Sequence, residues 1–414
     1  MRVRPLAAAL LLLGGLPAGA APAARGVSRP VATVIAVVEP GGLNVLHAEF
    51  RAQRGATLPA GVPDDVEPIR LPRGGDFEER MRRASAGPLG RLEPGQLYHL
   101  AGTRVLLYPS PGRGLQNVFD APEHGTGTAS SAAGRRSGTD PHAWLVYVLG
   151  GDGASWRWLA EQSWIDVVSS SYYAVVPNGN GLCPEVTHIR TISDEGRLVF
   201  TAAGNQEQAG FAHSPAGAPG AYQVGGVDES GRTYLRPDAA PTEPDWATAT
   251  PTRPYETGDR FRYEAADPGS VDGAVTFGGT SGAAPSTAGR ATTLIRYARR
   301  VLGSSGTGVR RGALAEAPKG RDVPARGPLA DGDLTAAELT SLLHHVAVPA
   351  EPPSPARYMV EGYGALGDEA MARAVDVLRG AESEPERPAE DSAHDIVETA
   401  REALFADAVR RCGS

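Results

Sequence analysis

VATVIAVVEP, at residues 31–40, is the stretch on which the fold depends. Its first eight residues form an unbroken run of apolar, mostly β-branched side chains, which is typical of a strand buried in a parallel sheet. The run ends at a charged residue, Glu39. We therefore expect a buried strand that delivers one carboxylate at its carboxyl end.

Three further apolar runs read as strands: residues 144–149 (WLVYVL), 165–168 (IDVV) and 198–202 (LVFTA). Four segments between and after these runs read as helices: around residues 155–163, 186–196, 284–302 and 335–347. Strands that alternate with helices predict an α/β fold, in which a central parallel sheet is flanked by helices.

Two segments interrupt this alternation. Residues 51–100 are polar and rich in Pro, Gly and charge, which predicts loops and a short helix. Residues 303–333 are rich in Gly, Ala, Pro and Arg, which predicts a long surface loop. The overall composition, 41% hydrophobic and 21% charged, is that of a globular protein. The formal net charge of −8 gives no reason to expect a nucleic-acid partner.

The first 24 residues have the pattern of an export signal. Arg2 and Arg4 precede an apolar run at residues 6–16, and small residues of the A-x-A type follow it at residues 18–24. A membrane anchor is the alternative, but the run is shorter than the ~20 apolar residues of a spanning helix. We expect residues 1–24 to be a signal peptide, and the protein to be secreted, extracellular or periplasmic, with no membrane segment after cleavage.

GGTSGAAP, at residues 278–285, carries the strongest chemical signal. Small residues on both sides of Ser281 allow a backbone to approach its hydroxyl, and the helix that begins here places partial positive charge nearby. Taken alone, the same letters could form an ordinary turn and helix cap.

Two other segments strengthen the nucleophile hypothesis. EHGTGTA, at residues 123–129, places His124 at the start of a helix of small residues. FTAAGN, at residues 200–205, ends a strand in Asn205, whose amide can donate a hydrogen bond to a developing oxyanion. Each residue alone is more often structural. The chain order acid, His, Asn, Ser makes the set informative.

In that order these segments resemble the subtilisin-like serine proteases (S8-type peptidases), over most of residues 31–375. HGT at 124–126 resembles the family's histidine motif, GTS at 279–281 its serine motif and AGN at 203–205 its oxyanion motif. Supporting matches lie at residues 146–153, 166–171, 224–228 and 362–364. The resemblance implies a subtilisin-like three-layer fold and a serine endopeptidase.

The resemblance also implies roles for individual residues. Ser281 would be the nucleophile, His124 the general base and Asn205 an oxyanion donor, and the substrate would be a peptide or protein. The substrate would lie extended along Ser169, Ser170 and Ser171, and the other wall of the primary pocket would be Ala202, Ala203 and Gly204. Tyr172 and Tyr173 stand where relatives often have a small residue; they either reshape this pocket or pack the strand.

The acid departs from the family pattern, because Glu39 stands where the family has aspartate. A glutamate keeps the charge that orients the histidine, but its carboxylate reaches about one methylene further. Asp120, just before His124, is the rival acid, and a site without a functional acid is the third reading. The long spacing from Glu39 to His124 predicts an insertion at about residues 51–106. The short stretch between signal and first strand leaves no room for a folded propeptide, so we expect folding to proceed unaided or with help from the insertion or the tail.

Two other functions compete with the protease hypothesis. A subtilisin-like scaffold that binds a peptide or partner without cleaving it would explain the altered acid. An esterase of the α/β-hydrolase type would instead use Ser281, Asp333 and His344, and would leave His124 and Asn205 without a role.

The remaining expectations concern organisation. We expect a peptidase domain at residues 25–380, followed by a charged linker and an amphipathic helix at residues 381–414. Cys183 and Cys412 would either form one disulfide or remain two free thiols. The chemistry needs no metal or cofactor; relatives often hold structural calcium, but no carboxylate cluster in the sequence assigns such a site. We expect a monomer.

Overall fold

A nine-stranded sheet forms the centre of the protein, in the order β11-β10-β8-β6-β1-β5-β4-β3-β2. The computed structural model describes residues 32–53, 55–113, 117–172, 174–175, 183–203, 213–215, 218, 220–227, 246–249, 264–304, 312–348 and 363–383. The strands of this sheet are β1 (Val34–Glu39), β2 (Glu67–Arg70), β3 (Tyr98–Ala101), β4 (Val105–Pro109), β5 (Trp144–Leu149), β6 (Val167–Ser170), β8 (Leu198–Ala202), β10 (Ala221–Val227) and β11 (Trp246–Ala249).

Neighbouring strands run parallel throughout the sheet except for β3 and β4, which pair antiparallel. Three small two-stranded sheets lie outside it: β7 (Ala174–Val175) with β9 (His213–Ser214), β12 (Glu264–Ala266) with β13 (Ala274–Thr276), and β14 (Ala313–Glu316) with β15 (Asp333–Thr335). The predicted α/β class with a central, mostly parallel sheet is therefore confirmed.

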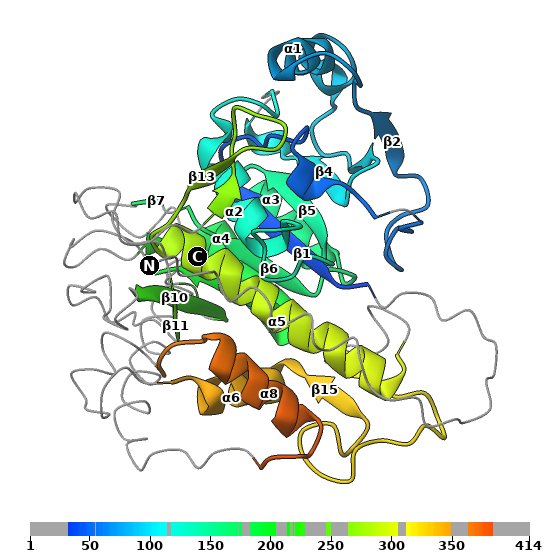
Figure 1. Cartoon of the computed structure of the whole chain (residues 1–414), viewed down its shortest axis with the longest axis vertical. Coiled ribbons are helices and arrows are strands. Elements are labelled where there is room, and N and C mark those ends of the chain that lie inside the picture. The colour runs from blue at the N-terminus through cyan, green and yellow to red at the C-terminus, as the bar shows by residue number, and fades with distance from the viewer. Residues whose placement is uncertain are drawn as a thin grey trace, which may run out of the picture. The chain divides into compact units, whose positions relative to one another are not determined.

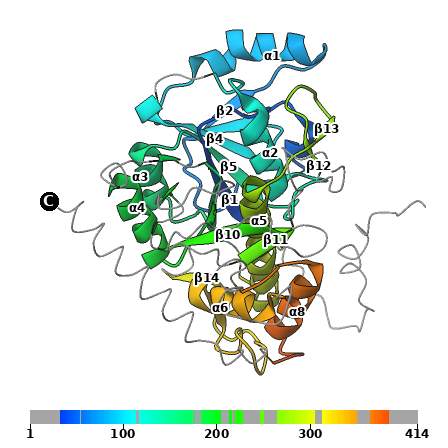
Figure 2. The ribbon, with the colours of Figure 1, turned by 90° about the vertical axis from the view of Figure 1, so that its left-hand side faces the viewer.

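Helices cover both faces of the sheet, because the side chains of its strands alternate between two apolar cores. Ile35 and Val37 of β1 face a core shared with α2 (Pro122–Ala133) and α5 (Thr280–Leu302). Val34, Ala36 and Val38 face a second core shared with α3 (Gly153–Glu161) and α4 (Cys183–Asp194). Figure 2 shows α3 and α4 on one side of the strands and α2 and α5 on the other.

The other helices in the described part of the chain lie at two ends of the sheet-centred domain. Helix α1 (Phe77–Ala86) lies with β2 at one end, and α6 (Ala336–Val346) and α8 (Asp368–Leu378) lie at the other (Figure 1). Short 3-10 helices are η2 (Ala48–Phe50), η3 (Pro88–Arg91) and η4 (Pro111–Arg113). In the described part of the chain, no helix has both the length and the apolar character needed to cross a bilayer.

The predicted insertion builds one edge of the sheet. Its short helix is α1, but residues 51–104 also contribute β2 and β3, which the sequence did not predict. Strand β2 reads EPIR with only Ile69 buried, so it has the polar, proline-containing character of an edge strand rather than the apolar run of a central one. The predicted surface loop at residues 303–333 likewise contains β14 and the start of β15.

Several expectations fall outside the described residues. These are the signal peptide at residues 1–24, the linker and helix after residue 383, Tyr173, Gly204, Asn205, Cys412 and the side chain of Cys183.

Candidate active site

The site lies at the carboxyl edge of three adjacent parallel strands. Strand β1 pairs with β6, and β6 pairs with β8, so the ends of these strands meet at one edge of the sheet. Glu39 is the last residue of β1, and Ser171 follows the last residue of β6. This edge is where open α/β sheets bind their ligands.

Glu39 and His124 form a close pair. The Glu39 Oε2 atom lies 2.9 Å from Nδ1 of His124, and the Glu39 side chain is fully buried. The imidazole comes from the first turn of α2 and is 43% exposed. The other carboxylate oxygen, Oε1, is buried and finds no hydrogen-bond donor in the described part of the chain. Among the described residues, His124 is therefore the hydrogen-bond partner of the Glu39 carboxylate.

The backbone around Glu39 accommodates the longer acid. After Glu39 the chain turns through Gly41 and Gly42, whose carbonyl oxygens both accept hydrogen bonds from the hydroxyl of Tyr147, at 2.6 and 2.8 Å. The Gly42 N–H donates to the carbonyl of Asp120 at 2.7 Å. These bonds tie the end of β1 to the segment that leads into α2, and so fix the distance between Glu39 and His124.

Two tight features accompany this turn. Ala121 has a φ of 45°, the left-handed region that residues with a Cβ rarely adopt, directly before the helix of His124. Gly125 packs so closely on the Tyr147 hydroxyl and the Gly42 carbonyl that a Cβ would collide with both. The small residues after His124 therefore serve close approach of α2 to the β1 turn.

Ser281 lies against the histidine. Its Oγ is 3.0 Å from Nε2 of His124, and the residue is 8% exposed. Helix α5 begins at Thr280, after Gly279 at a φ of 71°, a conformation that glycine adopts without strain. The first N–H groups of a helix have no intrahelical acceptor, so the Ser281 N–H is available beside its own hydroxyl.

A second hydrogen bond holds the Ser281 backbone. Pro285 stands four residues later inside α5 and has no N–H to donate to the Ser281 carbonyl. The hydroxyl of Ser171 donates to that carbonyl instead, at 3.1 Å. A proline at this spacing indicates that the Ser281 carbonyl needs an external donor, but no local pattern identifies Ser171 as that donor.

An aromatic ring packs against the histidine. Phe277 meets His124 edge to face, with ring centroids 5.6 Å apart, and covers Gly127 so closely that no Cβ would fit there. This contact has no local sequence signal, because it joins residues that are distant in the chain.

Burial lowers the pKa of His124, while the charge of Glu39 and the hydrogen bond to it raise that pKa; together they hold it above the usual 6.5. Burial, and then the nearby Glu39 carboxylate, raise the pKa of the Tyr147 hydroxyl, which remains a donor. The site thus consists of the Ser281 hydroxyl, the His124 imidazole and the Glu39 carboxylate, joined by two hydrogen bonds.

The structure corrects part of the predicted substrate edge. Ser169 and Ser170 each pair with β1 on one side and with β8 on the other, so neither can add a substrate strand. The pairing of β6 with β1 and β8 ends at Ser170. Ala202 ends β8, and the Ala203 N–H donates to the Val224 carbonyl at 3.0 Å.

Other candidates occupy different positions. Asp120 accepts from the Asn117 N–H at 3.1 Å, while Glu39 is the acid that contacts His124. His344 stacks on Tyr363 at a centroid distance of 3.6 Å, while His124 is the histidine that contacts Ser281. The Tyr172 hydroxyl donates to the Gly151 carbonyl at 2.6 Å and accepts from Trp156 Nε1 at 2.8 Å, which is the packing role.

One group of three carboxylates in the described residues, Asp331, Asp333 and Glu338, brings ligand oxygens within 4.8 Å of one another. Members of this group already make local hydrogen bonds within the chain. Glu338 completes a capping box with Thr335, and Asp331 accepts from the Asp333 N–H at 3.1 Å. We assign no calcium to it.

Comparison with known proteins agrees with this geometry. Residues 110–302 match the subtilase family model, and no curated protein matches the chain. Similar solved structures include a variant of the PatA protease domain, which is 15% identical to this chain with a TM-score of 0.50. The alignment covers 86% of this chain and 99% of that chain. The prenylagaramide maturation protease PagA is 15% identical, with 86% and 96% covered and TM-score 0.50. The PatG macrocyclase in complex with peptide is 13% identical, with 84% and 92% covered and TM-score 0.50. At these identities the likeness is one of fold.

Proposed function

We propose that the chain is a subtilisin-like serine endopeptidase with a Ser281-His124-Glu39 triad, which the match of residues 110–302 to the subtilase family model supports. The observation that supports this most strongly is the continuous line of hydrogen bonds from Glu39 through His124 to Ser281, at 2.9 and 3.0 Å. Both distances lie within the range expected of a nucleophile, its base and the group that orients the base.

The proposed reaction is acyl transfer. His124 Nε2 takes the Ser281 proton as Oγ attacks the scissile carbonyl carbon. The resulting oxyanion would accept hydrogen bonds from the Ser281 N–H and from Asn205. His124 then returns the proton to the leaving amine, so that the C–N bond breaks and an acyl-enzyme remains. Water, activated by His124, hydrolyses that ester and regenerates Ser281.

Glu39 would hold the imidazole in one tautomer, with Nδ1–H donating to Oε2 and Nε2 free to accept. It would also stabilise the imidazolium that forms during each proton transfer. The buried carboxylate suits this role because a low-dielectric surrounding strengthens its attraction for a cation.

We further propose that the substrate is a peptide or protein that lies extended from Ser171 onward, where the neighbouring strands no longer pair. A peptide is bound in one of the similar structures, the PatG macrocyclase. The n-region, apolar run and small-residue site at residues 1–24 support export of the enzyme.

A fluorophosphonate probe tests the triad, because it reacts with a serine that is activated by a general base. We expect the full-length protein to be labelled, and labelling to be lost in Ser281→Ala and reduced by at least about 10³-fold in His124→Ala. His142→Ala and His344→Ala are the matched controls and should be labelled like the unaltered protein. If labelling does not depend on Ser281 and His124, the site is a binding scaffold. If it depends on His344, the esterase hypothesis is correct.

A further inference from the structure

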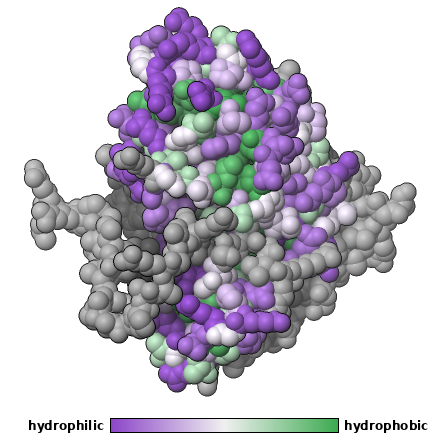
Figure 3. All heavy atoms as spheres, turned by 90° about the vertical axis from the view of Figure 1, so that its right-hand side faces the viewer, coloured by the Kyte–Doolittle hydropathy of each residue, from purple (hydrophilic) through white to green (hydrophobic). Residues whose placement is uncertain are grey.

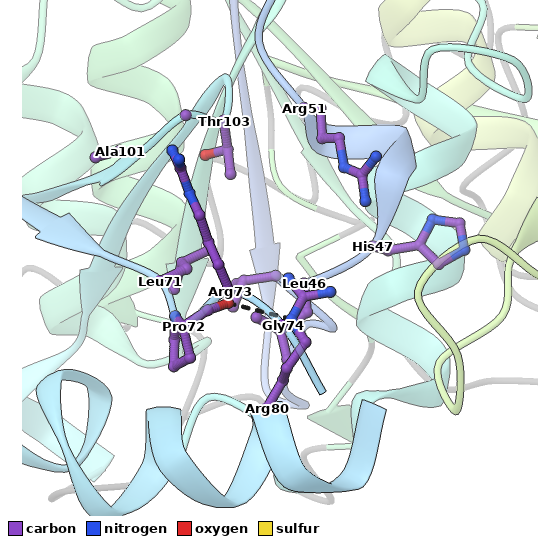
Figure 4. Close-up of a pocket in the computed structure, with 12 residues that line it drawn as sticks. Leu46, His47, Arg51, Leu71, Pro72, Arg73, Gly74, Arg80, Ala101 and Thr103 are labelled. Carbon is purple, nitrogen blue, oxygen red and sulfur yellow. Dashed lines mark hydrogen bonds between the residues drawn. The ribbon is translucent and has the colours of Figure 1, made fainter. Parts of the chain in front are cut away.

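A pocket of about 320 Å³ lies beside the segment that follows β1. Val45 and Leu71 contribute apolar walls, and three arginines reach the pocket from three separate segments: Arg51, Arg73 and Arg80 (Figure 4). Arg51 follows η2, Arg73 follows β2, and Arg80 comes from α1. Except for Val45, all of these residues belong to the predicted insertion. The surrounding surface at the α1 end is mostly hydrophilic, with an apolar band below it (Figure 3).

The described residues that line the pocket include no carboxylate. Two acids on neighbouring elements are engaged elsewhere: Glu79 pairs with Arg83 at 3.8 Å, and Glu49 pairs with Arg136 at 2.9 Å. Arg80 donates from Nε to the Pro72 carbonyl at 3.1 Å, which leaves its terminal nitrogens available. Burial, together with the like charges of Arg51 and Arg83, lowers the pKa of Arg80. Like charges gathered in one pocket without an acid would be stabilised by an anionic ligand.

The pocket wall is also connected to the active site. His47 lines the pocket, and its Nε2 lies 2.8 Å from the Gly273 carbonyl. The Ala48 N–H donates to the Val271 carbonyl at 2.7 Å. Gly273 immediately precedes β13, which leads through Phe277 to Ser281, whereas His47 follows Glu39 closely in the chain. The pocket therefore adjoins the segment that follows Glu39 and the segment that leads to Ser281.

We propose that this arginine pocket binds an acidic side chain, Asp or Glu, of the polypeptide substrate, at a position away from the scissile bond. The proposal rests on the proposed peptidase function. A guanidinium group presents paired N–H donors that match a carboxylate, and three of them can hold it from different directions. The volume is at the small end for ligand pockets, which suits one or two side chains.

Charge selectivity at this pocket has to be local. The chain carries a net charge of −8, so its overall field repels an acidic polypeptide. Three arginines in one pocket reverse that repulsion at a single place. A substrate with an acidic residue in reach of the pocket would then be preferred over a neutral one of the same sequence at the scissile bond.

The test is a binding measurement on the full-length Ser281→Ala protein, which cannot cleave. A hexaglutamate peptide with an uncharged fluorophore is titrated, and its anisotropy is compared with that of a hexaglutamine peptide. We expect hexaglutamate to bind and hexaglutamine not to bind. Arg51→Gln and Arg73→Gln should each weaken binding by about tenfold, since each removes charge-assisted hydrogen bonds. Arg157→Gln, an exposed arginine on α3, makes the same charge change as a control and should bind like the parent.

Equal affinity in the pocket variants, or an equal loss in Arg157→Gln, would overturn the proposal. So would a result in which inorganic phosphate binds in an Arg51-dependent way while hexaglutamate does not, since the ligand would then be a small free anion. Probe labelling of Ser281 reports the proposed peptidase function separately, so failure of one can be told from failure of the other.

Discussion

Glu39 is longer than aspartate by one methylene, and the turn at Gly41 and Gly42 is built for that length. Its Oε2 reaches His124 Nδ1 at 2.9 Å while the whole side chain is buried. An aspartate on the same backbone would place its carboxylate oxygen about 1.5 Å further from His124 Nδ1, which is the length of one C–C bond.

We therefore expect Glu39→Asp to impair the enzyme, although aspartate is the residue of the family it resembles. The rate of fluorophosphonate labelling should fall by about 10²-fold, the typical cost of a 1 Å misplacement. Glu39→Gln, which keeps the length but loses the charge, should cost about 10³–10⁴-fold. If Glu39→Asp is labelled as fast as the unaltered protein, the backbone moves to close the gap and the fitted turn is not required.

The pH dependence of labelling reports the same pair. Labelling needs neutral His124, and its pKa is held above 6.5 by Glu39 against the effect of burial. The rate should therefore rise with pH through this elevated pKa. In Glu39→Gln the raising charge is gone, so the midpoint of the rise should move to lower pH while the plateau falls. A midpoint that stays in place would show that another group controls the titration.

At the scale of elements, the Ser171 hydroxyl links the end of β6 to the start of α5. Ser171, just beyond β6, donates to the Ser281 carbonyl at the start of α5, where Pro285 cannot. The bond connects the edge that would receive the substrate with the backbone of the nucleophile.

A double-mutant cycle measures this link. Ser171→Ala leaves a buried carbonyl without its donor, so we expect the free energy of unfolding to fall by about 1–3 kcal/mol and probe labelling to slow. In the Ser171→Ala background, Pro285→Ala gives that carbonyl a helical N–H donor. We expect Pro285→Ala to raise the free energy of unfolding of this background by about 1 kcal/mol more than it raises that of the unaltered protein. Strict additivity in denaturant unfolding would show that the two groups do not share the Ser281 carbonyl.

The elements that the sequence predicted best are those with a simple physical signature. Residues 144–149 and 198–202 became β5 and β8 with the predicted bounds, because continuous apolar runs are buried on both faces. The strand predicted at residues 165–168 begins two residues before the observed β6, which spans Val167–Ser170. Asp166 precedes β6 and belongs to a buried ion pair with Arg299. Ser169 and Ser170 end β6 and are buried, but a search for apolar runs does not find buried serines.

The candidate site was predictable where residues lie in local motifs and not where they meet by tertiary contact. Ser281 and His124 each follow from a short motif, whereas Glu39 was favoured over Asp120 only by its place at the end of the first strand; the structure brings all three together. The bonds of Tyr147 to the β1 turn and of Ser171 to Ser281 join segments over 100 residues apart. No local spacing encodes them.

At the scale of the whole molecule, one buried ion pair joins the sheet to the far end of α5. Arg299 pairs with Asp166, and also donates to the carbonyls of Ala32 and Leu314, each at 2.8 Å. Asp166 in turn accepts from the Val34 N–H at 2.9 Å. The starts of β1 and β6, the end of α5 and strand β14 thus share one charged centre.

Removing one partner should be costly. Arg299→Met leaves the Asp166 carboxylate buried without a cation, so we expect the free energy of unfolding to drop by about 3–5 kcal/mol. The double variant Arg299→Met with Asp166→Asn removes the stranded charge and keeps an acceptor for Val34, so it should be the more stable of the two. Guanidinium unfolding checks the order; a double variant less stable than the single one would contradict this account.

Helix α5 connects the Arg299–Asp166 ion pair to the active site. It is one continuous element of 23 residues, about 34 Å long, with Ser281 on its second residue and Arg299 near its last. Its distal half packs in the same core as Leu342 of α6 and Val377 of α8. Ser281 thus lies at one end of a single helix whose other end is held by packing against α6 and α8. We expect changes of side-chain volume in α6 or α8 to shift the helix along its axis and so to change the distance from the Ser281 hydroxyl to His124.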